Sequence, residues 1–204
     1  MKLTLVVAHP DPGSFNAAIA RAVREAAVAA GADVRVHDLY ADGFDPRMPA
    51  VEVGTTRFAD ELTARYAQEV LDADTFVIVH PVWFFHAPAA MKGWVDRVMR
   101  EGVVYHVGAG DRTEGLLRAQ AALVITTANA PEALEVGVLG DPLGTFWDRI
   151  VFGFGGVSDV RRVRFAAVKE STPEVRAAWL EEVGRAVRTL VRDAAEARAQ
   201  DREP

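Results

Sequence analysis

The chain has 204 residues, of which half are hydrophobic and a quarter are charged, and its formal net charge is −6. This charge disfavours a nucleic-acid partner, because a phosphate backbone is bound by clustered lysine and arginine. The chain has no cysteine, which excludes disulfides, thiolate metal ligands and cysteine nucleophiles.

The length suits one domain spanning residues 1–204. No apolar run approaches the roughly 20 residues needed to cross a bilayer, and the first residues enter a strand pattern without a signal peptide. We therefore expect a cytoplasmic protein without membrane insertion. Residues 196–204 are polar, and we expect them to form a frayed tail.

The first predicted unit is a strand, a loop and a helix. Residues 3–8 are apolar and predict a strand; the loop that follows carries two prolines and a glycine. Ser14 is a natural N-cap for a helix that Gly31 closes. The free N–H groups and dipole at this helix start predict an anion site in the loop. The loop matches neither a Walker P-loop nor the Gly-x-Gly-x-x-Gly fingerprint.

A second strand is predicted over residues 33–38, and a long connection follows over residues 39–56. Connections of this length are often functional or form an interface. Apolar residues four apart predict a second helix over residues 56–71.

The most informative stretch begins with a third strand over residues 75–79, which is apolar and β-branched, as in a buried parallel sheet. Pro81 ends this strand, and Trp83, Phe84 and Phe85 follow it before a helix over residues 88–100. Ligands of open α/β sheets bind at this edge, and aromatic rings there suit a flat ligand that stacks. The same rings could equally be ordinary core.

The remaining pattern continues in the same way. Residues 102–115 predict a polar loop, residues 121–127 a fourth buried strand, and residues 141–152 a helix that Gly153 breaks. Residues 160–168 predict a fifth strand and residues 173–198 a last helix. Repeated β–α units predict an α/β fold of three layers, with a five-stranded parallel sheet in flavodoxin-like order 2-1-3-4-5 and helices on both faces.

Three separated motifs resemble the flavodoxin-like NAD(P)H:quinone oxidoreductases, the DT-diaphorase type that includes ancillary proteins of potassium-efflux systems. The motifs are His9-x-x-x-x-Ser14-Phe15-Asn16, then Pro81-x-Trp83-Phe84 leading to Pro88-x-x-x-Lys92-Gly93-Trp94, then Thr126-Thr127. The resemblance covers residues 1 to about 130. It implies non-covalent FMN, or alternatively FAD, with NADPH or NADH as electron donor. It also implies a homodimer and a quinone or other aromatic acceptor reduced by ping-pong hydride transfer.

The resemblance also assigns roles to residues. His9, Ser14, Phe15 and Asn16 would hold the flavin phosphate and ribityl chain, while Pro81, Val82, Trp83 and Phe84 would line the isoalloxazine. The backbone of residues 82–84 would reach the polar edge of the ring. Thr126, Thr127, Ala128 and Asn129 would face its pyrimidine end.

The sequence departs from the family after Thr127, where Ala128 and Asn129 replace a common Gly-Gly pair, and residues 131–145 lack the Tyr and His of the eukaryotic enzymes. The flavin itself would carry the chemistry. We expect Asn129 to contribute at the pocket, although an Asx-type turn explains it equally well. His86, Tyr105 and His106 are further candidates for substrate contact, with surface positions as the plain alternative. The histidine spacing fits no zinc signature, so we expect no metal.

Two other functions compete with the enzyme. A flavin-binding regulatory subunit of a membrane transporter would keep the flavin site and make catalysis secondary, and a flavodoxin-type electron carrier would lack the long loop at residues 39–56. Bound flavin and rapid NADPH oxidation would distinguish the enzyme from a flavin-free binding module.

Overall fold

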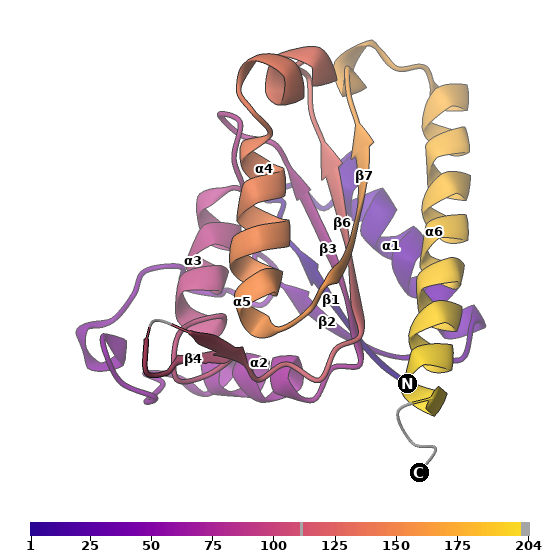
Figure 1. The fold of residues 1–204 in the computed structure, drawn as a ribbon. Helices are drawn as coiled ribbons and strands as arrows, with labels where there is room; N and C mark the ends of the chain where they lie inside the picture. The colour runs from indigo at the N-terminus through magenta and orange to yellow at the C-terminus, as the bar shows by residue number, and fades with distance from the viewer. Residues whose placement is uncertain (111, 201–204) are drawn as a thin grey trace.

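The computed structural model describes residues 1–110 and 112–200, and it shows a parallel sheet between two layers of helices (Figure 1). The strands of this sheet are β1 (Lys2–Val7), β2 (Asp33–Asp38), β3 (Thr75–Pro81), β6 (Ala121–Thr127) and β7 (Asp159–Phe165). Their order across the sheet is β2-β1-β3-β6-β7, and all neighbours are parallel. Since β6 and β7 are the fourth and fifth strands of this sheet, the predicted order 2-1-3-4-5 is confirmed.

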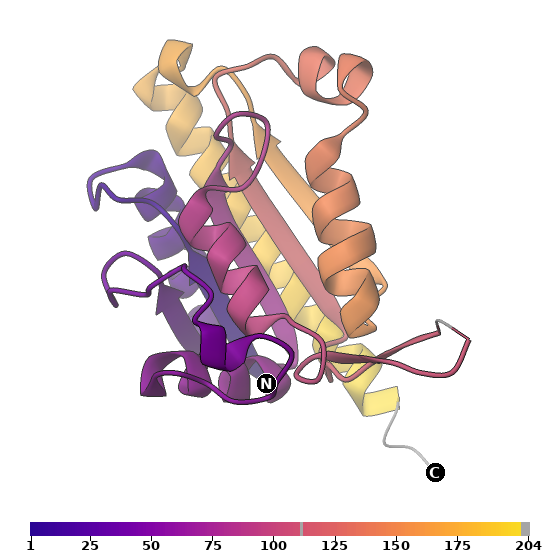
Figure 2. The same cartoon turned by 90° about the vertical axis from the view of Figure 1, so that its left-hand side faces the viewer.

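Helices cover both faces of the sheet, each over its own apolar core (Figures 1 and 2). On one face α1 (Phe15–Ala29) packs beside α6 (Pro173–Gln200). On the other face lie α2 (Glu61–Leu71), α3 (Ala89–Val98) and a continuous helical stretch made of α4 (Pro142–Gly144), η3 (Thr145–Phe152) and α5 (Gly153–Gly155). All residues of β3 and β6 are buried, as predicted for central strands of a parallel sheet.

The ends of several elements differ from the predictions. The strand β3 continues two residues beyond Val79, because His80 and Pro81 still pair with β6. The fifth strand ends at Phe165, and a short 3₁₀ turn, η4 (Val168–Glu170), follows it. The last helix is regular to Gln200, so the fraying expected from residue 196 does not begin there. Arg198 near its end forms an ion pair with Asp74, the residue before β3. Residues 201–204 lie outside the described part of the chain.

The predicted start of the second helix at residue 56 is wrong, because α2 begins at Glu61. Asp60 is its N-cap and accepts a hydrogen bond from the Thr63 N–H at 2.8 Å. The residues before it are held elsewhere: the Ala59 N–H donates to Glu52 Oε1 at 2.8 Å. The start of α2 is therefore set by the capping carboxylate of Asp60 and not by the spacing of apolar residues.

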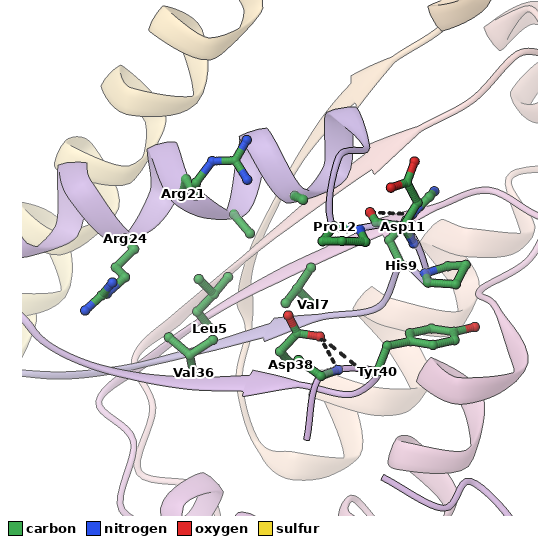
Figure 3. Close-up of a pocket in the computed structure, with 14 residues that line it drawn as sticks. Leu5, Val7, His9, Asp11, Pro12, Arg21, Arg24, Val36, Asp38 and Tyr40 are labelled. Carbon is green, nitrogen blue, oxygen red and sulfur yellow. Dashed lines mark hydrogen bonds between the residues drawn. The ribbon is translucent and has the colours of Figure 1, made fainter. Parts of the chain in front are cut away.

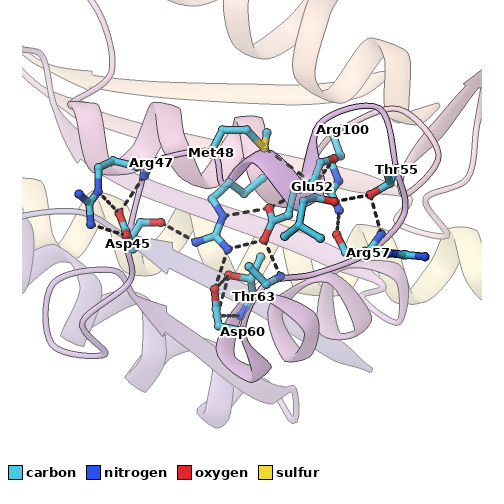
Figure 4. A network of polar contacts seen from close by, with 12 residues as sticks. Asp45, Arg47, Met48, Glu52, Thr55, Arg57, Asp60, Thr63 and Arg100 are labelled. Carbon is cyan, nitrogen blue, oxygen red and sulfur yellow. Dashed lines mark hydrogen bonds and ion pairs between the residues drawn. The ribbon is translucent and has the colours of Figure 1, made fainter.

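The long connection after β2 is fixed to α3 by a buried ion cluster (Figure 4). Arg97 of α3 donates to both oxygens of Glu52, which lies in the 3₁₀ turn η1 (Ala50–Glu52), at 3.0 and 2.5 Å. The same guanidinium reaches the Asp45 carbonyl at 2.7 Å and Asp60 at 2.6 Å. Gly93 leaves room for this connection, since a Cβ there would lie 2.3 Å from the Pro46 carbonyl oxygen. The connection is thus a fixed part of the fold.

Two predictions for the second half of the chain are wrong. Residues 102–115 contain an antiparallel hairpin of β4 (Tyr105–Val107) and β5 (Thr113–Gly115) where only a loop was expected. The helix after Asp141 passes through Gly153 and ends at Gly156, whose φ of 91° is left-handed. Both segments meet at one long-range contact. The backbones of Gly115 and Gly155 touch, since a Cβ on Gly115 would lie 2.3 Å from the Gly155 carbonyl carbon, and this long-range contact leaves no periodicity in the sequence.

The chain between β6 and β7 contains two π-helical segments that the sequence does not indicate. They are η2 (Ala133–Val138) and η3. Asp141 is the N-cap of the helical stretch that begins at Pro142, because its side chain accepts a hydrogen bond from the Gly144 N–H at 3.0 Å. Turns of π-helix are rare and often lie near functional sites.

Candidate flavin site

Polar side chains fold the loop between β1 and α1. Asp11 accepts a hydrogen bond from the Gly13 N–H at 2.8 Å, and Ser14 caps α1 by accepting one from the Ala17 N–H at 3.2 Å. The Asp11 N–H donates to His9 Nδ1 at 3.1 Å, so a neutral His9 carries its proton on Nε2. A helix has no internal acceptor for its first N–H groups, and those at the start of α1 can therefore bind an anion.

A tight turn follows the end of β3. The N–H of Trp83 donates to the His86 carbonyl at 3.0 Å, and the N–H of His86 donates back to the Trp83 carbonyl at 3.1 Å. Phe84 and Phe85 between them have φ angles of 48° and 59°, a left-handed conformation that costs a non-glycine residue about 1–2 kcal/mol. The Phe84 side chain is 98% exposed and Trp83 is 44% exposed. Strained backbone of this kind is concentrated at binding sites.

Asn16 joins the first loop to the end of β6. Its Nδ2 donates to Thr127 Oγ1 at 2.9 Å, and the Thr127 carbonyl accepts the Val82 N–H at 2.7 Å. Asn16 is 4% exposed, and its Oδ1 has no hydrogen-bond partner among the described residues. A buried oxygen without a donor is uncommon in folded proteins, so this atom is able to accept a hydrogen bond from outside the chain.

The residues after Thr127 are tied to β7. The Ala128 N–H donates to the Phe165 carbonyl at 2.8 Å, and Asn129 Oδ1 accepts a hydrogen bond from the Lys169 N–H at 3.2 Å. The Asn129 amide oxygen therefore joins two loops that follow neighbouring strands. Its NH₂ group has no acceptor among the described residues and is able to donate elsewhere.

These segments enclose a pocket of about 380 Å³ at the carboxyl end of the sheet. The predicted cofactor residues that line it are His9, Ser14, Phe15, Asn16, Pro81, Val82, Trp83, Thr127, Ala128 and Asn129. Three further lining residues, Val168, Lys169 and Arg176, were not singled out from the sequence. Their position after the fifth strand, at the same edge of the sheet, was the signal that could have found them.

The charge of the pocket favours an anion. Its lining contains the cations Lys169 and Arg176. Among the described residues, no aspartate or glutamate lines it. Together with the start of α1, these side chains surround the place where the sequence predicts a phosphate.

The two other predicted cofactor residues lie outside this lining. Phe84 projects from the turn into solvent, and Thr126 is buried in β6 opposite His80. The N–H groups of Val82 and Trp83, expected at the flavin edge, are already donated to Thr127 and to His86.

The further candidates for substrate contact are placed as follows. Asn129 lies in the pocket, whereas the His86 ring packs on Phe146 with centroids 4.7 Å apart. Tyr105 and His106 lie on β4, beyond the C-terminus of α3 and at the opposite end of the sheet (Figure 1). Within one chain, these two residues are therefore remote from the pocket.

The floor of the site is supported by His80, which was not among the predicted site residues. His80 Nε2 accepts a hydrogen bond from Trp147 Nε1 at 3.0 Å, so the proton lies on Nδ1, which donates to the Pro81 carbonyl at 2.8 Å. Burial lowers the pKa of His80 to about 4. A neutral imidazole thus links η3 to the strand end that carries Trp83.

In residues 1–110 and 112–200, no group of three or more histidine, aspartate or glutamate side chains is arranged to hold a metal ion. None of the described helices combines the length and the apolarity that a bilayer crossing requires.

Comparison with known proteins places the chain in a family. The family model described as "Flavodoxin-like fold" matches residues 1–189. The chain is 29% identical to human ribosyldihydronicotinamide dehydrogenase [quinone] over an alignment 167 residues long, which covers 72% of this chain and 72% of the relative. It is 27% identical to an uncharacterised NAD(P)H oxidoreductase of Haemophilus influenzae over 185 residues, covering 89% of this chain and 91% of the relative.

Among solved structures, the NAD(P)H:quinone oxidoreductase of Methanothermobacter marburgensis superposes with a TM-score of 0.79 at 25% identity, over 93% of this chain and 96% of the other. The resemblance read from the three sequence motifs is thereby confirmed. The chain belongs to the flavodoxin-like-fold family and, like these relatives, is an oxidoreductase.

Proposed function

We propose that the protein binds FMN and uses it to reduce quinone-like acceptors with electrons from NADPH or NADH. The observation that carries the proposal is the convergence, in one pocket, of a helix N-terminus, two cations and a half-exposed Trp83. A phosphate suits the first two features and a flat ring suits the third. The names of the relatives add the nicotinamide donor and the quinone acceptor.

The described residues fit such a cofactor. Asn16 Oδ1 is buried without a donor, and a ribityl hydroxyl would supply one. Lys169 and Arg176 balance phosphate charge, and His9 Nε2–H is free to donate, since Nδ1 accepts from Asp11. Pro81, Val82 and Trp83 would line the isoalloxazine ring.

The pyrimidine edge of the ring needs donors, because negative charge collects there on reduction. The N–H groups of Val82, Trp83 and Ala128 are bonded within the fold, so we assign this role to the Asn129 NH₂ group. We place Phe84 at the rim of the pocket, where it would cover the bound partner.

The bound flavin would supply the hydride chemistry. The protein binds and orients the partners, and because the pocket has one open side, the nicotinamide would leave before the acceptor enters. This order gives ping-pong kinetics. We also propose a homodimer in which a second copy covers the turn at Phe84, since a ring that is 98% exposed suits an interface.

The decisive experiment begins with reconstitution. The purified protein is stripped of small molecules and titrated separately with FMN and with FAD, followed by flavin fluorescence. We expect saturable 1:1 binding with a preference for FMN, then anaerobic bleaching by NADPH or NADH and reoxidation by 2-methyl-1,4-naphthoquinone. Parallel double-reciprocal plots would support the ping-pong order. A protein that binds neither flavin would disprove the proposal.

A further inference from the structure

A second cavity lies between α1 and the edge strand β2, on the other side of the loop at residues 9–12 (Figure 3). Its volume is about 440 Å³, within the range of small-molecule pockets. The lining combines the sheet face, α1 and the loops that follow β1 and β2. The sheet contributes Leu5, Val7 and Val36, and α1 contributes Ala17, Ala20 and Arg24. We call this cavity the α1–β2 groove.

The body of the groove is apolar. Leu5 and Val7 form a buried floor, and Val36 beside them is 39% exposed although it lies on the sheet face that α1 covers (Figure 3). The groove stays open because Ala17 and Ala20 are the only apolar side chains that α1 contributes to its lining. A leucine at either position would fill part of it. An exposed apolar surface bordered by polar groups marks a binding site.

The acidic side chains of the groove are bonded within the chain, whereas its arginines are not paired with a carboxylate of the described residues. Asp38 Oδ1 accepts the N–H groups of Tyr40 and Ala41 at 3.3 and 3.1 Å, and Asp11 is bonded to Gly13. Arg21 and Arg24, in contrast, form no ion pair with any carboxylate in the part of the chain that the structure describes. The groove therefore offers an apolar surface beside two arginines, Arg21 and Arg24, that have no carboxylate partner among the described residues.

We propose that the α1–β2 groove binds a small amphipathic organic anion, with an aliphatic body on Leu5, Val7 and Val36 and a carboxylate at Arg24. A helix rises about 1.5 Å per residue, so Ala17 and Arg24 are roughly 10 Å apart along α1. That span matches an eight-carbon chain. Arg21 also borders a hollow toward α6, which makes Arg24 the principal determinant of charge recognition.

The probe is octanoate, titrated into ¹⁵N-labelled protein with and without FMN and followed by backbone amide NMR. We expect saturable shifts in residues 17–24 and 36–41, whether or not the flavin site is filled. Arg24→Gln should weaken octanoate binding roughly tenfold, as expected for loss of a charge-assisted hydrogen bond. Ala20→Leu should abolish the shifts by filling the groove.

Matched variants separate groove effects from general ones. Arg185→Gln removes an exposed arginine of α6, and Ala29→Leu adds the same side chain at the far end of α1; both should bind octanoate as the wild type does. The uncharged 1-octanol should bind at least several times more weakly than octanoate. The proposal is overturned if the shifts are absent, if they cluster at Trp83 and Asn129, or if Arg24→Gln binds like Arg185→Gln. These results do not depend on flavin binding, so they stand apart from the proposed function.

Discussion

The two polar regions of this molecule use their charged and hydrogen-bonding groups in opposite ways. In the Arg97 cluster the guanidinium is 1% exposed and finds all its partners within the chain, namely Glu52, Asp60 and the Asp45 carbonyl (Figure 4). In the candidate flavin site, Asn16 Oδ1 has no donor among the described residues, Lys169 and Arg176 line the pocket, and the backbone at Phe84 and Phe85 is strained.

The difference teaches how to separate structure from function in a family fold. Satisfied polar groups hold the chain, here the connection after β2 onto α3, and removing one leaves buried charge behind. Unsatisfied groups and strain are tolerated where a ligand completes them. Perturbing the first region should therefore change stability, and perturbing the second should change ligand binding.

The largest effect is expected from Arg97→Met. This change leaves the fully buried carboxylate of Glu52 with Arg100, at 3.2 Å, as its one remaining cation among the described residues. Breaking a buried ion pair costs about 3–5 kcal/mol of unfolding free energy. Urea denaturation at pH 7 measures it, with Arg185→Met as the control, because that arginine is 63% exposed and its pair with Glu181 spans 3.9 Å. A loss below 1 kcal/mol, or a loss of flavin affinity without a loss of stability, would contradict the comparison.

The next effect is a pH dependence of the unfolding free energy that arises from His80. The unfolded chain protonates this residue below its ordinary pKa of 6.5, whereas burial keeps it neutral in the fold down to about 4. The unfolded state thus binds more protons between these values, so stability should fall as the pH is lowered from 6.5 toward 4, by at most about 1.4 kcal/mol per pH unit. Above pH 6.5 this residue should contribute no slope.

Urea midpoints at pH 5 and pH 7 test this prediction. The difference between them should shrink in His80→Gln and stay unchanged in His106→Gln, which alters an exposed histidine at the other end of the sheet. An equal slope in wild type and His80→Gln would show that His80 is not the titrating group.

A smaller effect is expected from Asn16→Asp, and it should appear in flavin binding. The substitution places a carboxylate beside the proposed phosphate and removes the donor to Thr127 Oγ1. We expect FMN affinity to fall by roughly 30-fold, about 2 kcal/mol. Ser14→Ala removes one neutral hydrogen bond to the Ala17 N–H and should cost only about 1 kcal/mol. Fluorescence titration at constant ionic strength compares the two, and equal FMN affinity in Asn16→Asp and the wild type would place the phosphate elsewhere.

The sequence predicts the part of the fold that depends on local patterns. The apolar runs of β3 and β6 and the cap at Ser14 are local signals, and the structure places them as predicted. The β4–β5 hairpin and the passage of the helix through Gly153 depend on contact between Gly115 and Gly155. A contact between residues forty positions apart has no local pattern, so the sequence could not show it.

The same limit applies to the site. The loops after β1, β3 and β6 were found because they carry unusual residues at strand ends, and most of these residues line one pocket. Lys169 and Arg176 follow β7, where a lysine and an arginine look like ordinary surface, and only the fold brings them to the pocket. The Arg97–Glu52 pair was missed for the same reason, since its partners are forty-five residues apart.

The smallest effect is expected from Asn129→Gly, which restores the family's more common residue. The Asn129 amide oxygen accepts the Lys169 N–H at 3.2 Å, a bond worth about 1 kcal/mol or less, so the change should alter stability only slightly and FMN should remain bound. Its NH₂ group is the donor that we assign to the pyrimidine edge. The reduced flavin, which carries negative charge there, should lose more stabilisation than the oxidised form. The flavin midpoint potential should therefore become more negative, by an amount that spectroelectrochemistry can measure. Asn129→Asp keeps the oxygen for Lys169 but replaces the donor with a charge, and should lower the potential further. A potential that is equal in all three proteins would show that Asn129 only joins the loops after β6 and β7.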